Sequence, residues 1–274
     1  GGVPDVTYQS RTDIRRLLER HGLHPRKSLG QHFLADPNLI RKVVEVAEVG
    51  PGDRVLEVGA GTGALTGALA AAGARVVAYE VDERLRPVLE EALAGADVDL
   101  RFADVMDADL QAELEGDGWK LVANLPYNVG TPLVLDVLMR VTKVTTVTVM
   151  VQQEVADRFT ARPSTPDYGI PSVVVALCGR VVERFPVPPQ VFVPAPQVQS
   201  AVVRIDRVDP PPRWEEAVAI ARRAFGQRRK MLRRSLQGVV AEAAYARTGI
   251  DPQSRPEDLS PGDFVRLAEA AADE

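Results

Sequence analysis

The chain has 274 residues, 45% of them hydrophobic, which is enough for one large domain or for one large and one small domain. It contains no run of about 18 apolar residues, so we expect no membrane-spanning helix, and its single cysteine, Cys178, excludes an internal disulfide framework and fits a reducing cytoplasm. With three histidines and no cysteine cluster we expect no metal site. The net charge of −5 at pH 7 weighs mildly against a nucleic-acid binder, because phosphate contacts need Lys and Arg.

Residues 1–25 are predicted to be a lead-in with one short helix, which begins at Thr12 or Asp13 as the N-cap. After it, apolar residues recur first at helical spacing and then in short β-rich runs. The predicted elements up to residue 102 are a helix at Asn38–Glu48, a strand at Arg54–Val58, a glycine loop at Gly59–Gly63, a helix at Ala64–Ala72, a strand at Arg75–Glu80, a helix at Glu83–Ala94 and a strand at Val98–Phe102.

The same alternation of strands and helices continues to residue 151, which predicts a mostly parallel, doubly wound α/β sheet covered on both faces. Two later β-rich runs suit an antiparallel pair at the sheet edge and bring the expected total to seven strands. These later elements are strands at Trp119–Ala123, Val144–Val151, Val181–Phe185 and Ala201–Ile205, and helices at Pro132–Arg140, Gln153–Ala161 and Pro171–Leu177.

The best domain boundary is the stiff proline-rich linker at residues 209–212. It divides an α/β domain at 26–207 from a small all-helical domain at 208–274.

The glycine loop carries the first chemical signal. Gly59 and Gly61 lie between a strand and a helix, where glycine lets the chain turn tightly and lets a ligand approach the backbone. Glu80 ends the next strand, where it can accept hydrogen bonds from a ribose diol, and Asp104 follows the third strand. The loop also satisfies the dinucleotide fingerprint of dehydrogenases. Glu57, two residues before the first glycine, instead resembles the first motif of S-adenosylmethionine-dependent methyltransferases.

The tetrapeptide Asn124-Leu125-Pro126-Tyr127 follows the fourth strand, whose end is expected beside the first strand and therefore beside the cofactor. Its chemistry suits an exocyclic amine. The Asn124 side-chain oxygen and the Leu125 carbonyl can accept the two N–H bonds and free the nitrogen lone pair, while Pro126 fixes the backbone. Tyr127 offers a flat face for a base, and such stacking contributes about 1–3 kcal/mol.

Taken with these motifs, the region from Arg26 to Leu236 closely resembles the ribosomal small-subunit RNA adenine N6-dimethyltransferase family. The resemblance is carried by linked motifs in order: the octapeptide at Lys27–Leu34, the loop at Glu57–Gly63, Asn124–Asn128, Gln153–Ala156, Phe192–Ser200 and Gln227–Leu232. It departs from the family pattern at His32, where Asn is usual, at Gln197 and Gln199, where Lys and Asp are common, and at Arg234, where Asn is frequent.

The resemblance implies a site for S-adenosylmethionine and a site for a flipped adenine. The residues expected at the cofactor are Gln31, His32, Leu34, Glu57, Gly59, Gly61, Glu80, Asp104 and Asn124. The residues expected at the adenine are Asn124, Leu125, Pro126 and Tyr127, with Phe192 closing the other face of the base.

Basic residues gather near the start of the C-terminal region, where residues 204–234 hold ten Lys/Arg against four Asp/Glu. Because no acid lies between Glu216 and Glu242, compensating pairs are not expected and phosphate binding is favoured. Three of these arginines would share one side of a continuous helix, which Gly226 could break. The residues expected to bind RNA are Arg222, Arg223, Arg228, Arg229, Lys230, Arg233 and Arg234.

The function expected from the resemblance is dimethylation of the N6 amino groups of two adjacent adenosines in a 16S rRNA hairpin, coupled to small-subunit biogenesis. The expected partners are a precursor of the small ribosomal subunit and its 16S rRNA. The enzyme itself is expected to be a cytoplasmic monomer with no membrane association. The alternatives are a large-subunit rRNA methyltransferase that confers macrolide resistance and a non-catalytic RNA-binding assembly factor. A dehydrogenase is a more distant alternative.

Overall fold

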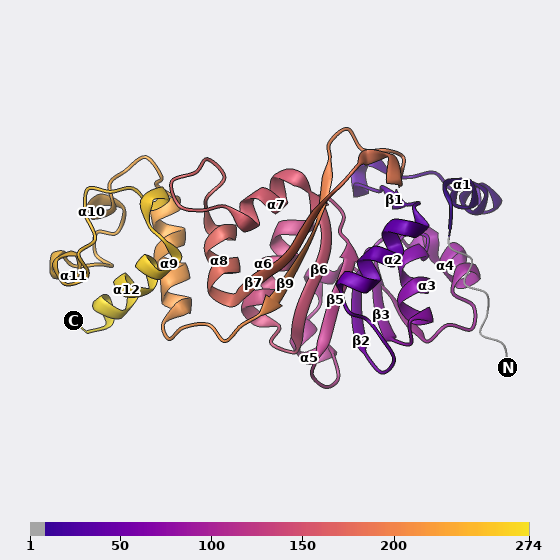
Figure 1. The fold of residues 1–274 in the computed structure, drawn as a ribbon, viewed down its shortest axis with the longest axis horizontal. Helices are drawn as coiled ribbons and strands as arrows, with labels where there is room; N and C mark the ends of the chain where they lie inside the picture. Colours follow the sequence, from indigo (N-terminus) through magenta and orange to yellow (C-terminus); the bar gives the residue numbers. More distant parts are fainter. Residues whose placement is uncertain (1–8, 274) are drawn as a thin grey trace. The chain divides into compact units, whose positions relative to one another are not determined.

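The computed structural model describes residues 9–273, so the first eight residues of the expected lead-in lie outside the described part. The chain forms two compact units. One contains Gly1–Ala156 and Val181–Asp206, and the other contains Asp157–Arg180 and Arg207–Glu274 (Figure 1).

The first unit is built on a seven-stranded sheet with strand order β4-β3-β2-β5-β6-β9-β7. Its central pairs are parallel, and β9 runs antiparallel to β6. The strands are β2 (Arg54–Val58), β3 (Arg75–Glu80), β4 (Val98–Phe102), β5 (Trp119–Asn124), β6 (Val144–Gln152), β7 (Gly179–Val187) and β9 (Ser200–Arg207). The strand order reverses between β2 and β5, so their carboxyl ends open a crevice of the kind that binds ligands in doubly wound sheets. The predicted fold class is confirmed.

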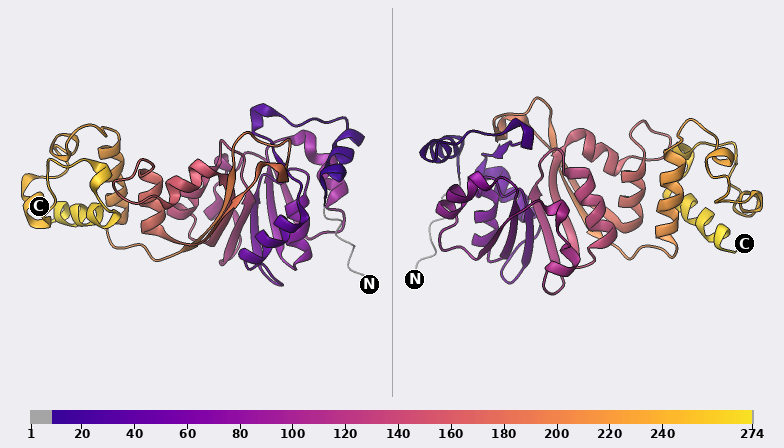
Figure 2. Two further views of the ribbon diagram at one scale, coloured as in Figure 1. Left: turned by 45° about the horizontal axis from the view of Figure 1, so that its top comes forward. Right: turned by 180° about the vertical axis from the view of Figure 1, so that it is seen from behind.

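Helices cover both faces of this sheet (Figures 1 and 2). One face packs against the first four helices through a continuous apolar core that includes Ile14, Ile40, Leu69 and Leu89. On the other side α6 packs against β6. The helices are α1 (Arg11–Arg20), α2 (Pro37–Val46), α3 (Ala64–Ala71), α4 (Arg86–Ala92), α5 (Leu110–Glu113) and α6 (Gly130–Arg140).

Local side-chain hydrogen bonds set where the first helices begin. Ser10, and not Thr12 or Asp13, is the N-cap of α1, and it forms a reciprocal capping box with Asp13. Asp36 caps α2, where its carboxylate accepts from the Leu39 N–H at 3.0 Å and Pro37 takes the first helical position.

A small second sheet joins two segments that are far apart in sequence. Strand β1 (Phe33–Leu34) pairs antiparallel with β8 (Phe192–Val193), so that Phe33 lies opposite Val193 and Leu34 lies opposite Phe192. The Ala35 N–H donates to the Val191 carbonyl at 2.8 Å, and the Arg11 guanidinium donates to the Phe192 carbonyl at 2.6 Å. The N-terminal segment is therefore held against residues 191–193.

The second unit is helical. Its helices are α8 (Ile170–Cys178), α9 (Trp214–Phe225), α10 (Leu232–Ser235), α11 (Glu242–Thr248) and α12 (Pro261–Ala272), while α7 (Gln153–Thr160) spans the boundary. Residues 157–180 belong here and not, as expected from sequence, to the first domain, because α8 packs against α9 and α12. Buried Tyr168 strengthens that packing by donating from its hydroxyl to the Leu259 carbonyl at 2.6 Å.

Within residues 9–273, no helix combines the length and the apolar character needed to cross a membrane.

Candidate active site

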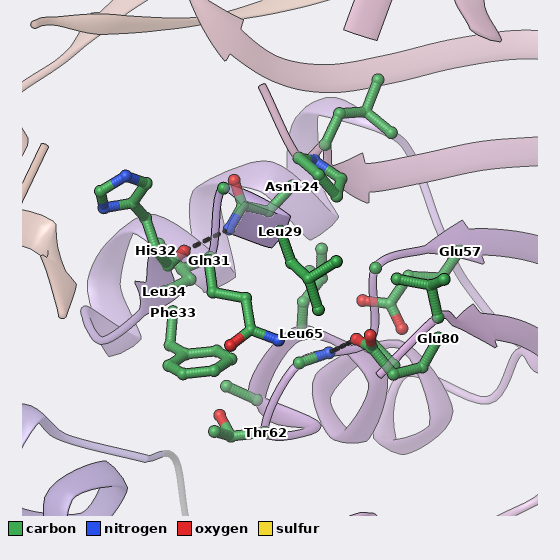
Figure 3. Close-up of a pocket in the computed structure, with 18 of the residues that line it drawn as sticks. Leu29, Gln31, His32, Phe33, Leu34, Glu57, Thr62, Leu65, Glu80 and Asn124 are labelled. Atoms are coloured by element: carbon green, nitrogen blue, oxygen red, sulfur yellow. Dashed lines mark hydrogen bonds between the residues drawn. The ribbon is translucent and has the colours of Figure 1, made fainter. Parts of the chain in front are cut away.

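A pocket opens where the strands β2, β3 and β5 end (Figure 3). Its walls come from three segments: the N-terminal stretch before α2, the glycine loop with the acid that ends β3, and the tetrapeptide after β5. The expected site residues that line it are Gln31, His32, Leu34, Glu57, Gly59, Gly61, Glu80, Asn124, Leu125, Pro126 and Tyr127.

The glycine loop is shaped by left-handed backbone and by close packing. Gly59 and Gly61 have φ of 79° and 59°, which favour glycine. A Cβ at Gly59 would lie 3.1 Å from Cδ of Pro126, and one at Gly61 would lie 3.0 Å from Cδ1 of Phe33. The loop is therefore enclosed by both neighbouring segments of the pocket, and a larger residue at either glycine would push one of them away.

Glu80 is almost fully buried and is held by backbone donors. Its Oε1 accepts from the Gly61 N–H at 2.8 Å and its Oε2 accepts from the Asp82 N–H at 2.9 Å. Burial raises its pKa, although hydrogen bonds from the backbone of Asp82, Gly61 and Val81 oppose that effect. A carboxylate can accept about four hydrogen bonds, so Glu80, which lines the pocket, has acceptor capacity left for a diol.

Glu57 lies at the floor of the pocket and is completely buried. It accepts a short hydrogen bond from the Thr66 hydroxyl. Desolvation raises its pKa to about 8, and the nearby Glu80 carboxylate adds to the effect. Glu57 is thus mostly protonated at neutral pH.

A second hollow adjoins the first and shares several walls with it, including Leu29, Gly59 and Glu80. Val81 and Asp104 line this hollow. Val81 is an apolar side chain that is 50% exposed directly after the buried acid Glu80. An apolar surface beside a carboxylate and a glycine turn fits a nucleoside, whose purine packs on apolar atoms while its ribose donates hydrogen bonds.

Asn124 is oriented by a hydrogen bond that fixes which way its amide faces. Its Nδ2 donates to the His32 backbone carbonyl at 3.1 Å (Figure 3). Because a carbonyl can only accept, the amide nitrogen must face it, and Oδ1 is turned the other way. Among the described residues Oδ1 accepts no hydrogen bond, so it is available to an incoming N–H. The Leu125 N–H donates a hydrogen bond to the Met150 carbonyl at 3.1 Å, which holds the tetrapeptide to β6.

Phe192 does not reach the pocket, contrary to expectation. Its side chain is only 1% exposed and belongs to the apolar core beneath α1 and α2. The reason is the non-local pairing of β8 with β1, which turns the Phe192 side chain into that core. In this structure the second face of a base in the site is therefore not closed by Phe192.

The basic residues of the second unit do not share a continuous helix. Helix α9 ends at Phe225, with Gly226 as the C-cap, and the next helix begins only at Leu232. The spacing that would align Arg222, Arg229 and Arg233 on one helical side is therefore broken.

Several of these residues also have partners that are distant in sequence, which corrects the expectation that compensating acids are absent. Arg228 pairs with Glu257 at 3.3 Å, and Arg233 pairs with Glu242 at 2.7 Å. Arg223 donates to the carbonyls of Ser235 and Gln237 at 2.9 and 3.1 Å and so holds the local fold. The residues whose side chains are exposed and make no hydrogen bond or ion pair with residues 9–273 are Arg222, Arg229, Lys230 and Arg234.

The sequence alone did not point to two further residues of the pocket, Leu29 and Val81, or to the buried acid Asp82 beside them. Leu29 lies between the two hollows, Val81 forms the apolar surface, and Asp82 accepts from Gln31 Nε2 at 2.9 Å and so holds the N-terminal segment over the glycine loop. An apolar residue placed directly after a strand-ending acid was the available signal for Val81.

The strand order, the glycine loop and the acid that ends β3 define a class I S-adenosylmethionine-dependent methyltransferase. Residues 22–273 match the family model for ribosomal RNA adenine dimethylases. The chain belongs to this family, and the resemblance drawn from its motifs is confirmed.

Named relatives and solved structures agree with this assignment. The ribosomal RNA small subunit methyltransferase A of Phenylobacterium zucineum is 44% identical over 97% of this chain and 94% of that protein. The protein of the same name from Deinococcus radiodurans is 44% identical over 90% of this chain and 85% of its own length. The structure of a dimethyladenosine transferase from Plasmodium falciparum matches the fold with a TM-score of 0.72 at 21% identity, covering 86% of this chain and 96% of that one. The 23S rRNA methyltransferase ErmE matches with a TM-score of 0.66 at 28% identity, covering 88% and 99%.

Proposed function

We propose that this chain transfers methyl groups from S-adenosylmethionine to the N6 amino groups of adenosines in small-subunit (16S) rRNA and produces N6,N6-dimethyladenosine at two adjacent positions. The observation that carries the proposal is the fixed amide of Asn124. Its Oδ1 is free and lies in the wall of a pocket whose other end fits a nucleoside.

The residues of the pocket suit the cofactor. Glu80 would accept from the ribose hydroxyls, and Val81 and Asp104 would lie at the purine, with Gly59 and Gly61 allowing the backbone to come close. When bound, S-adenosylmethionine supplies an electrophilic methyl group on a sulfonium. The residues of the chain then have to bring the amine to that methyl group in line.

Asn124 and Leu125 supply the acceptors for the amine. The N6 lone pair of adenine is delocalised into the ring and is a poor nucleophile. Accepting its two N–H bonds with the Asn124 Oδ1 and the Leu125 carbonyl would draw the nitrogen toward tetrahedral geometry and free the lone pair. A strong general base is not required, because the nitrogen becomes acidic once it is methylated. Positioning therefore carries the catalysis.

The target adenosine would have to leave its RNA helix, since N6 is out of reach inside one. Tyr127 would then provide the stacking surface, and the exposed arginines and lysine of the second unit, Arg222, Arg229, Lys230 and Arg234, would hold phosphates. As part of the same proposal, the enzyme acts as a cytoplasmic monomer on a precursor of the small subunit. Family relatives that are 44% identical carry the small-subunit name, which favours this substrate over the large-subunit RNA named for ErmE at 28% identity.

The test is methyl transfer from labelled S-adenosylmethionine to small ribosomal subunits that lack adenine dimethylation, with naked large-subunit RNA in parallel. Label on the subunits, recovered as N6,N6-dimethyladenosine, is the expected result. Label only on the large-subunit RNA would move the assignment to the ErmE-type activity. Tight binding to the subunits without any label would favour the non-catalytic assembly factor.

A further inference from the structure

His32 contacts the tetrapeptide through both its backbone and its side chain. Its carbonyl accepts from Asn124 Nδ2 at 3.1 Å, as described above. Its imidazole stacks on the Tyr127 ring, with 5.0 Å between the ring centroids and 30° between the planes. One residue therefore touches both the group that would receive the amine and the ring on which the base would stack.

The imidazole is held in that position by a third contact. His32 Nδ1 lies 2.8 Å from the Pro194 carbonyl. Since the carbonyl can only accept, Nδ1 carries the proton, and the ring plane is fixed between Tyr127 and the segment that follows β8. Figure 3 shows the imidazole pointing away from Glu57 and Glu80, which line the cofactor end of the pocket.

The spacing of the two rings also decides where a base can go. A base between two aromatic rings needs about 7 Å between their centroids, the upper end of the range for direct ring pairs. At 5.0 Å the His32 ring and the Tyr127 ring are in direct contact, and no base fits between them. The His32 ring therefore covers one face of the Tyr127 ring, and a base could stack only on the opposite face.

The far end of the Tyr127 ring lacks a comparable anchor. The hydroxyl groups of Tyr127 and Ser200 are both buried, and neither has a hydrogen-bond partner among the described residues. The Ser200 residue is 2% exposed. Burial raises the pKa of Tyr127, and the neighbouring Ser200 hydroxyl opposes that rise. Among the ring–ring contacts of residues 9–273, the stack on His32 is the one that involves Tyr127.

We propose that His32 is a positioning residue for the target adenine, and that its imidazole fixes the plane of Tyr127 as the support of the base-stacking surface. This rests on the proposed function and changes the role expected for His32, from a cofactor contact to a support of the base site. It is also a role that an Asn at this position could not fill, because an amide has no ring to stack.

The experiment separates stacking, hydrogen bonding and cofactor binding. It uses the full chain with His32→Ala and His32→Phe, and with His24→Ala as the control, because His24 is an exposed histidine outside the pocket. For each protein, the kcat of methyl transfer to undimethylated small subunits is measured at saturating S-adenosylmethionine, and the Kd for S-adenosylmethionine is measured by calorimetry. His32→Ala should lower kcat by about 3- to 10-fold, the range for one aromatic pair, and leave the Kd within about twofold.

His32→Phe keeps the stack and loses the bond to Pro194, so it should retain most of the wild-type kcat. In a Tyr127→Ala background, His32→Ala should cause no further loss, since its effect passes through Tyr127. A weaker cofactor Kd with unchanged kcat, or equal losses in His32→Phe and His32→Ala, would overturn the proposal. So would full additivity with Tyr127→Ala. If the wild-type enzyme does not label small subunits, both the proposed function and this inference are wrong. If the wild-type enzyme labels them normally and His32→Ala has an unchanged kcat, only the inference is wrong.

Discussion

Glu57 should make the stability of the folded chain depend on pH in a direction opposite to that of most carboxylates. Its pKa is raised from 4.5 to about 8 by complete burial, so the folded protein keeps a proton that the unfolded chain loses. Between pH 5 and pH 7 the unfolded state releases this proton and the folded state does not, and the free energy of unfolding falls as the pH rises. With about 1.4 kcal/mol for each pH unit over most of this window, the contribution amounts to about 2–3 kcal/mol.

Glu57→Gln removes this dependence and keeps an acceptor for the Thr66 hydroxyl. Urea unfolding at pH 5, 6, 7 and 8 should therefore show that the free energy of unfolding of the variant rises relative to that of the wild type as the pH rises. This difference should level off above about pH 8, where the folded wild-type protein also loses the proton. Because other titrating groups affect both proteins alike, the difference between the two curves isolates Glu57. Parallel curves over this range would refute the claim that Glu57 is protonated in the folded state.

Three further predictions address the site and the basic surface. Asn124→Ala should lower kcat by at least about 100-fold and leave binding to small subunits unchanged, as the loss of one preorganised polar contact does elsewhere; full activity in the labelling assay would remove Asn124 from the mechanism. Gly61→Ala should lower the free energy of unfolding, measured in urea, by about 1–3 kcal/mol and weaken cofactor binding, because a Cβ there meets an aromatic ring at 3.0 Å. Gly118→Ala is the control for backbone strain alone, because Gly118 also has a positive φ but has open space around it. Arg229→Glu should weaken RNA binding and flatten its dependence on salt. Arg75→Glu, at the exposed amino end of β3, should not, and equal effects of the two substitutions would mean that only net charge matters.

The sheet could be predicted from sequence because its signals are local. The strands β2, β3 and β5 are short, mostly apolar runs with a site residue at or next to their carboxyl ends, and the alternation with helices dictates parallel pairing. For β3 the predicted and observed limits are the same, Arg75–Glu80, and β5 extends only one residue beyond its prediction, to Asn124. The convergence of Glu57, Glu80 and Asn124 on one pocket follows from that topology, since carboxyl ends of neighbouring parallel strands share one edge.

What sequence reasoning could not supply is pairing between distant segments. The burial of Phe192 depends on a two-residue strand that finds its partner far away at Leu34, and no local pattern encodes that register. The ion pairs of Arg228 and Arg233 fail to appear in a local charge count for the same reason. The division of the chain, with residues 157–180 in the helical unit, likewise depends on packing that a proline-rich linker does not reveal.

The pairing of β1 with β8 has a consequence for the order in which the site can form during synthesis. The segment that covers the glycine loop is made early, yet it is fastened by the carbonyls of Val191, Phe192 and Pro194, which are made much later. A nascent chain that stops at the end of β6 already holds the glycine loop, Glu80 and the Asn124 tetrapeptide, and Gln31 and His32 can already bond to Asp82 and Asn124. It still lacks the strand β8 that pairs with Phe33 and Leu34. The full set of contacts that hold this wall of the pocket can therefore form only after the chain has grown past Pro194, late in its own translation.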